Sequence, residues 1–148
     1  MIKRNLLKKE AEHLLGHAGL KRTPGRVEML SVLLNAHEPL TQQEILDRVS
    51  ETGFNRVSVY RSLHAFTEAG LVHRVEAGDR LWRFAICHCG SRIHCHPHFT
   101  CRVCGKVECL SNVSLPQLKE PLPGYRVEEQ EVYLKGTCAG CRAPESAS

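Results

Sequence analysis

The sequence over residues 56–86 is RVSVYRSLHAFTEAGLVHRVEAGDRLWRFAI. Its first part repeats apolar residues at helical spacing, with Val59, Leu63 and Phe66 on one face. The segments LVHRV and RLWRFAI that follow have the composition of two strands, and the EAGD between them is typical of a tight turn. This stretch therefore predicts a helix over about 56–69 followed by a β-hairpin.

Three more helices are expected before this stretch. One ends near Gly19, and the next begins at Thr23-Pro24, a capping hydroxyl followed by a proline in the first turn. The third begins at TQQE (41–44), a capping box flanked by a hydrophobic staple of Leu40 and Ile45. Helices in this order with a terminal hairpin, in a basic segment, are typical of a winged helix-turn-helix. The expected inward residues of the first two helices are Leu7, Ala11, Leu14, Leu15, Ala18, Val27, Leu30, Leu33 and Leu34.

The charge distribution allows two interpretations of this part of the chain. The whole chain carries a net charge of +4, and its first 26 residues contain seven basic residues against two acidic ones. The outward face of the helix over 56–69 offers hydrogen-bond donors and an aromatic ring, a composition suited to phosphates and base edges. The same face could equally be the solvated side of a helical domain. The residues on it are Arg56, Ser58, Tyr60, Arg61 and His64.

Cysteine and histidine are concentrated in the second part of the chain. Six of the eight cysteines and four of the nine histidines fall between residues 87 and 109, and the first 83 residues contain no cysteine. The first residues, MIKRNLLKKEAEHLL, are too charged for a secretory signal, and no stretch has the roughly 20 apolar residues that cross a membrane. A cytoplasmic protein is therefore expected, and in that compartment clustered cysteines indicate metal binding rather than disulfides.

Four motifs together resemble one known family. They are GLKRTPGR (19–26), VSVYRSLHAFTEAGLVHRV (57–75), the HxHxxCxxCG pattern over 96–105, and a terminal CxxC preceded by PGYRVEEQEVYLKG (123–136). The chain is similar over nearly its whole length to the ferric uptake regulator family, and most similar to its zinc uptake regulator branch.

This resemblance implies an α+β fold with two domains. Residues 1–84 would form a winged-helix DNA-binding domain, and residues 85–148 an α/β dimerisation domain with a structural four-cysteine zinc site. Members of the family are dimeric, metal-sensing regulators, usually repressors. The expected partners are therefore double-stranded operator DNA with an inverted repeat and a second copy of the chain, with no membrane and no small organic substrate. The residues expected to contact DNA are Lys21, Arg26, Arg56, Ser58, Tyr60 and Arg61.

Two CxxC pairs form the strongest metal motif. Cys101, Cys104, Cys138 and Cys141 supply four thiolates, enough for a closed tetrahedral zinc site. The 33 residues between the pairs exceed the usual spacing of a compact zinc ribbon, so we expect a site that joins distant strands. Buried or redox-active cysteines are the alternative.

A second, regulatory metal site is expected from the resemblance. The family's histidine pair maps to His96 and His98, while its two acidic ligand positions map to Arg83 and Cys109. A guanidinium cannot ligate a metal, and thiolate with imidazole favours zinc over ferrous or manganous ion. His73, Cys87 and His94 resemble ligands of the zinc uptake regulator branch. The candidate regulatory ligands are His73, Cys87, His94, His96, His98 and Cys109, with His88, Cys89 and Cys95 as spare residues.

The expected function is a repressor that binds operator DNA when zinc-loaded and controls zinc-uptake genes. Zn2+ would be both structural and regulatory; the alternative is an iron-responsive or peroxide-sensing repressor of the same family, with regulatory Fe2+ or Mn2+. A thiol redox switch through Cys89 or Cys95 is a further alternative. An enzyme is not expected, because the sequence has no HExxH, no GxSxG and no glycine-rich phosphate loop.

Overall fold

The computed structural model of the protein describes residues 1–49, 53–87, 97–110, 113, 122–128 and 132–143. The chain divides into two compact units, an N-terminal unit (Met1–Ser91) and a C-terminal unit (Arg92–Ser148). The boundary expected after residue 84 lies inside a strand of the N-terminal unit, Trp82–Ile86. Within the described ranges, no helix is both long enough and apolar enough to cross a membrane.

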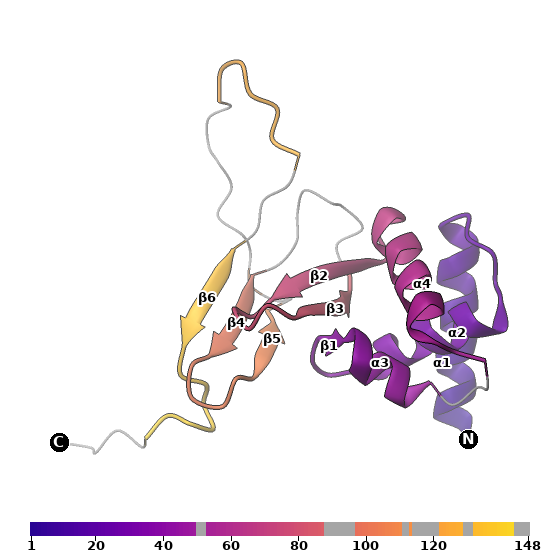
Figure 1. Cartoon of the computed structure of the whole chain (residues 1–148), viewed down its shortest axis with the longest axis horizontal. Helices are drawn as coiled ribbons and strands as arrows, with labels where there is room; N and C mark the ends of the chain where they lie inside the picture. Colours follow the sequence, from indigo (N-terminus) through magenta and orange to yellow (C-terminus); the bar gives the residue numbers. More distant parts are fainter. Residues whose placement is uncertain (50–52, 88–96, 111–112, 114–121, 129–131, 144–148) are drawn as a thin grey trace. The chain divides into compact units, whose positions relative to one another are not determined.

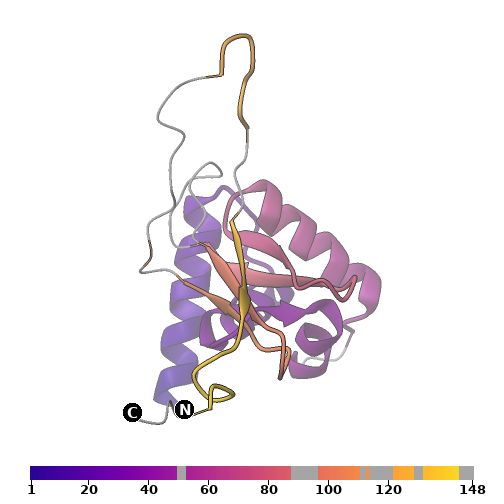
Figure 2. The ribbon, with the colours of Figure 1, turned by 90° about the vertical axis from the view of Figure 1, so that its left-hand side faces the viewer.

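The N-terminal unit contains the four expected helices and the hairpin (Figure 1). Helix α1 lies alongside α2, and Figure 2 shows α1 along its length. The α+β fold class is thereby confirmed. The elements are α1 (Ile2–His17), α2 (Pro24–Asn35), β1 (Leu40–Thr41), α3 (Gln42–Arg48), α4 (Arg56–Glu68), β2 (Val72–Glu76) and β3 (Trp82–Ile86).

Side-chain caps fix where the helices begin. The Thr23 hydroxyl accepts a hydrogen bond from the Arg26 amide at the start of α2. At α3 the capping box is complete: the Glu44 amide donates to Thr41 Oγ1 at 3.2 Å, and the Thr41 amide donates to Glu44 Oε2 at 2.7 Å. Each such cap stabilises its helix by about 1 kcal/mol, because it satisfies an amide that has no partner within the helix.

The hairpin of β2 and β3, here called the wing, is part of a three-stranded sheet in the order β1-β3-β2. Its two strands pair antiparallel, with Val72 opposite Ile86 and Glu76 opposite Trp82. Strand β1 was not expected from the sequence: its Leu40 pairs with Phe84, so the residue expected to staple α3 also joins the sheet. This short strand attaches the wing to the start of α3.

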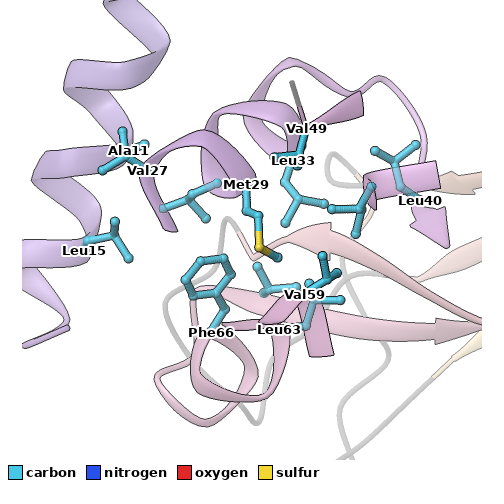
Figure 3. Close-up of a cluster of buried hydrophobic side chains, with 13 residues drawn as sticks. Ala11, Leu15, Val27, Met29, Leu33, Leu40, Val49, Val59, Leu63 and Phe66 are labelled. Atoms are coloured by element: carbon cyan, nitrogen blue, oxygen red, sulfur yellow. The ribbon is translucent and has the colours of Figure 1, made fainter. Parts of the chain in front are cut away.

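A single apolar core joins the helices to the sheet (Figure 3). Phe66 and Leu63 of α4 are at most 2% exposed and lie in one cluster with Met29 of α2 and Leu15 of α1. All three inward residues expected for α4 are buried. Burying side chains of this size stabilises the fold by about 1.5–3 kcal/mol each, which holds α4 at a fixed orientation within the unit.

Glu28 of α2 is a buried carboxylate that fastens α1 to the core. Its side chain is 5% exposed and forms ion pairs with Arg4 at 2.9 Å and with Lys8 at 3.0 Å, both from α1. Burial alone raises the pKa of the Glu28 carboxyl. The hydrogen bonds and charges of Lys8 and Arg4 outweigh burial, so the pKa lies below its ordinary value.

The described part of the C-terminal unit is a three-stranded sheet in the order β5-β4-β6. The strands are β4 (His98–Cys101), β5 (Val107–Cys109) and β6 (Tyr133–Gly136). Strand β4 lies between the other two (Figure 1), antiparallel to β5 and parallel to β6. The turn from β4 to β5 requires Gly105, whose φ is 75°.

We predict that Glu28→Gln reduces the pH dependence of stability in acid. A carboxyl with a lowered folded-state pKa stabilises the protein above its ordinary pKa, and this stability is lost as the pH falls through the folded-state value. The variant should lose roughly 1–3 kcal/mol of unfolding free energy at pH 7, and this difference from the wild type should shrink below pH 4.5. Urea unfolding at pH 7 and below pH 4.5 measures the free energy of unfolding of both proteins. Glu12→Gln, at an exposed position of α1, is the control and should change neither value.

Candidate metal and DNA-binding sites

The parallel pairing of β4 with β6 brings the two CxxC pairs together. Cys101 ends β4 and lies opposite Gly136, the last residue of β6, so the turn carrying Cys138 follows at the same end of the sheet. The Arg102 amide donates to the Gly136 carbonyl at 2.7 Å and extends this pairing into the turns. Distant parts of the chain therefore meet in one four-cysteine cluster, as the spacing predicted.

The sulfurs of this four-cysteine cluster have the separation of a tetrahedral zinc site. All four lie within 4.8 Å of one another, and Cys104 Sγ is 3.8 Å from Cys138 Sγ. Four sulfurs arranged tetrahedrally at about 2.3 Å from a zinc ion are roughly 3.8 Å apart. Cys101 is buried and Cys104 is exposed, and the four cysteines form no disulfide.

The surroundings of the four thiols favour a bound cation. The backbone amides of Cys104 and Cys138 lower the pKa of the Cys101 thiol to about 6, because both point at its sulfur. Hydrogen bonding to Cys138 and Cys104 raises the pKa of the Cys141 thiol to about 12. Ionisation of Cys101 is therefore favoured and that of Cys141 is opposed, and a divalent cation is the counter-charge that would stabilise both as thiolates.

His98 and Cys109 form a second pair of candidate metal ligands in the same unit. They lie directly opposite each other on β4 and β5, which places their side chains on one face of the sheet. A ring nitrogen of His98 lies within 4.8 Å of Cys109 Sγ. His98 is 1% exposed, and its ring packs against Tyr133 of β6 with centroids 5.9 Å apart.

His73 and Cys87 of the N-terminal unit also share a face. His73 pairs with Ala85 across the wing, and the Cys87 amide donates to the Leu71 carbonyl at 2.9 Å just beyond β3. Side chains alternate along a strand, so His73 and Cys87 lie on the same face of the wing, two residues apart in register. The remaining expected ligands, His94 and His96, lie outside the described residues, as do His88, Cys89 and Cys95.

Arg83 has a structural partner in the wing. Its guanidinium donates to Asp79 Oδ1 at 3.0 Å and to Asp79 Oδ2 at 2.7 Å. The Arg83 hydrogen bond lowers the pKa of the Asp79 carboxyl to about 2. Asp79 also accepts the Leu81 amide at 3.1 Å, so one carboxylate holds both the turn and the arginine of β3.

The start of α4 is held by hydrogen bonds to α3 and to its own cap. Asn55 Oδ1 accepts the Ser58 amide and also the Ser58 hydroxyl, which directs this hydroxyl to the cap. Arg56 donates to Gln43 Oε1 at 3.0 Å, and Gln42 Nε2 donates to the Arg56 carbonyl at 2.9 Å. These partners of Arg56 were not expected from the sequence, because two polar glutamines at the start of a helix carry no periodic signal.

A cleft of about 720 Å³ lies between α4 and the wing. Three arginines and one glutamate line it, so its charge is positive. Trp82 is 48% exposed in its wall, with the Arg74 guanidinium 4.8 Å from the ring centroid. Among its lining residues are Arg56, Tyr60, His64 and Glu68 of α4 and Arg74, Arg80 and Trp82 of the hairpin segment.

The remaining residues expected to contact DNA are accessible. Tyr60 is 60% exposed, and Lys21 and Arg61 are exposed, while Arg26 is half-buried in the first turn of α2. Arg74 and Arg80 were missing from the expected set, although the charged EAGDR segment of the hairpin could have indicated Arg80.

The sequence of the chain matches the model of a known protein family. Residues 17–135 match the model of the ferric uptake regulator family. The chain belongs to this family. The ferric uptake regulation protein of Yersinia pestis is 32% identical over 143 residues, which cover 90% of this chain and 93% of that protein. Since the family consists of regulators, the expectation of a regulator rather than an enzyme is confirmed.

Solved structures of ferric uptake regulator family members include zinc regulators. The crystal structure of holo XcZur is 27% identical, with a TM-score of 0.65 over 93% of this chain and 97% of that one. A zinc uptake regulator complexed with zinc and DNA has a TM-score of 0.67 at 24% identity, over 95% of each chain, which supports the fold. The resemblance to the family is therefore confirmed, and zinc uptake regulators are among the similar solved structures.

We predict that Cys138→Ser removes one zinc ion per chain and destabilises the C-terminal unit. The sheet of this unit is small, and a structural zinc ion contributes on the order of 10 kcal/mol to folding. Zinc content of the purified protein and thermal unfolding measure both effects. Thr137→Ser, one residue away on the same turn, is the control and should keep its zinc. A zinc-free variant that unfolds at the wild-type temperature would contradict a structural role.

Proposed function

We propose that this chain is a zinc-responsive repressor that binds operator DNA as a dimer when zinc is sufficient and releases it when zinc is scarce. The observation that carries the proposal is the pair His98 and Cys109, opposite each other on β4 and β5. One imidazole and one thiolate on the same face offer nitrogen and sulfur to a metal. Such a set favours zinc over ferrous or manganous ion, which prefer more oxygen ligands.

His73 and Cys87 are proposed as further ligands of the same regulatory zinc, with His94 or His96. They too offer imidazole and thiolate. Arg83 supports this choice. The family resemblance leads one to expect a carboxylate ligand at this position, and the guanidinium found there is instead paired with Asp79. His73 and Cys87 lie on the wing, so metal binding there and DNA binding would be coupled reciprocally.

The arginine-lined cleft and the exposed face of α4 support DNA binding by the N-terminal unit. Arg61 and Tyr60 are accessible on α4, and Arg80 lies on the wing side of the cleft. Guanidinium groups bind phosphates and guanine edges, and a helix with an adjacent wing presents such groups to a major groove and to the flanking backbone. The related zinc uptake regulator was solved in complex with zinc and DNA.

A dimer is proposed because an inverted repeat is read by two copies of one recognition helix. Strand β6 is at the edge of its sheet, and its Tyr133 and Leu134 are 36% and 43% exposed. An edge strand with exposed apolar side chains is suited to pairing with a second copy.

We predict that zinc tightens operator binding by between 5-fold and 150-fold, the usual range of such coupling. Duplexes selected from a random pool, once with zinc and once with ferrous ion, provide the operator for anisotropy titrations. Cys109→Ser should abolish most of the zinc effect, because it removes the thiolate ligand.

The control for this prediction is Cys89→Ser, which removes a spare cysteine and should leave the zinc response unchanged. Both variants should retain the zinc of the four-cysteine cluster, so a loss of the regulatory zinc can be distinguished from a loss of the structural zinc. Equal operator affinity with and without free zinc would refute metal-gated binding. A stronger response to ferrous ion than to zinc would favour the iron-sensing alternative.

We predict that Arg61→Ala weakens operator binding by about 1–3 kcal/mol if the arginine reads a base, or lowers the salt slope by about one if it contacts a phosphate. Arg126→Ala removes an equal charge from an exposed position of the other unit, outside β6, and is the matched control. If both variants lose affinity equally at every salt concentration, the contact is non-specific and the assignment of α4 is wrong.

A further inference from the structure

Helix α1 carries two histidines one turn apart that belong to neither group of candidate ligands. His13 and His17 are both exposed, and their rings are almost parallel, with an interplanar angle of 12° and centroids 6.2 Å apart. Residues at i and i+4 lie on the same face of a helix, so both rings point to the same side. Neither histidine contributes to the core of the unit.

This spacing is the one at which two imidazoles of a helix ligate one metal ion. In zinc-binding helices, histidines at i and i+4 reach the same ion from one face. Small rotations of the side chains are enough to aim one nitrogen of each ring at a common point, because the rings already lie side by side. His17 is in the last turn of α1, where the partial negative charge of the helix end favours a cation.

We propose that His13 and His17 form an additional divalent-cation site on α1, for a cation that prefers imidazole: Zn2+, or Ni2+ and Cu2+ in its place. The two imidazoles would supply two ligands, and water molecules would complete the coordination. The site is independent of the proposed function, since neither residue is among the candidate structural, regulatory or DNA-contacting residues.

Its affinity is lower than that of the thiolate sites. It offers two neutral ligands, while the four-cysteine cluster offers four sulfurs. The Arg22 guanidinium also packs against the helix at Gly16, and its positive charge opposes a nearby cation. The site therefore fills at free zinc concentrations at which the cysteine sites are already occupied.

The test is equilibrium dialysis of the full-length protein against buffered free zinc, with bound zinc counted by elemental analysis. The wild type should bind one more weakly held zinc ion per chain than His13→Gln/His17→Gln. Each single variant, His13→Gln or His17→Gln, should weaken the binding of this zinc ion by roughly 100-fold, because the second imidazole acts at high effective concentration. Far-ultraviolet circular dichroism checks that α1 remains helical.

Glu12→His/His13→Gln is the matched control, because it keeps two histidines but separates them by five residues, on different faces of α1. This variant should lose the weak zinc ion as completely as the double glutamine variant. If it retains the ion, or if the double variant binds as much zinc as the wild type, the proposal is overturned. Tightly bound zinc is counted in the same samples, so a failure of the proposed structural or regulatory sites is seen separately.

Discussion

Strands β4 and β6 come from distant parts of the sequence, and their parallel pairing determines what the C-terminal unit can bind. It aligns the two CxxC turns at one end of the sheet and brings four sulfurs within 4.8 Å of one another. Four thiols at this distance resist ionising together without a cation, and strands of three or four residues bury little apolar surface. A metal ion held by the four sulfurs would therefore stabilise the pairing of β4 with β6. The pairing of β4 with β5 in the same sheet sets His98 opposite Cys109.

The N-terminal unit is stabilised in a different way. A continuous apolar core fixes α4, and side-chain caps and a buried Glu28 fix the ends and the attachment of the other helices. None of the candidate metal ligands is a member of this core. This division is consistent with the proposed function, in which the N-terminal unit presents α4 and the wing to DNA and the C-terminal unit holds the four-cysteine cluster.

Much of this architecture follows from local sequence signals. The hydroxyl of Thr23, the capping box at Thr41 and the alternation of the wing are contained within a few residues each, so they could be predicted. Strand β1 could not, because two residues carry no periodicity and its pairing with β3 is non-local. The hydrogen bonds from Gln42 and Gln43 to Arg56 also depend on tertiary placement. The CxxC spacing predicted that the cysteines meet, and the structure adds the parallel strands that make them do so.

The ion pair between Asp79 and Arg83 has a consequence for how the metal preference of such a chain can change. Placing a carboxylate at position 83, as an oxygen-ligated site would need, would set two negative charges side by side at the turn and remove the partner of Asp79. The turn would loosen before any new site had formed. A carboxylate at position 83 therefore destabilises this turn unless Asp79 is replaced as well.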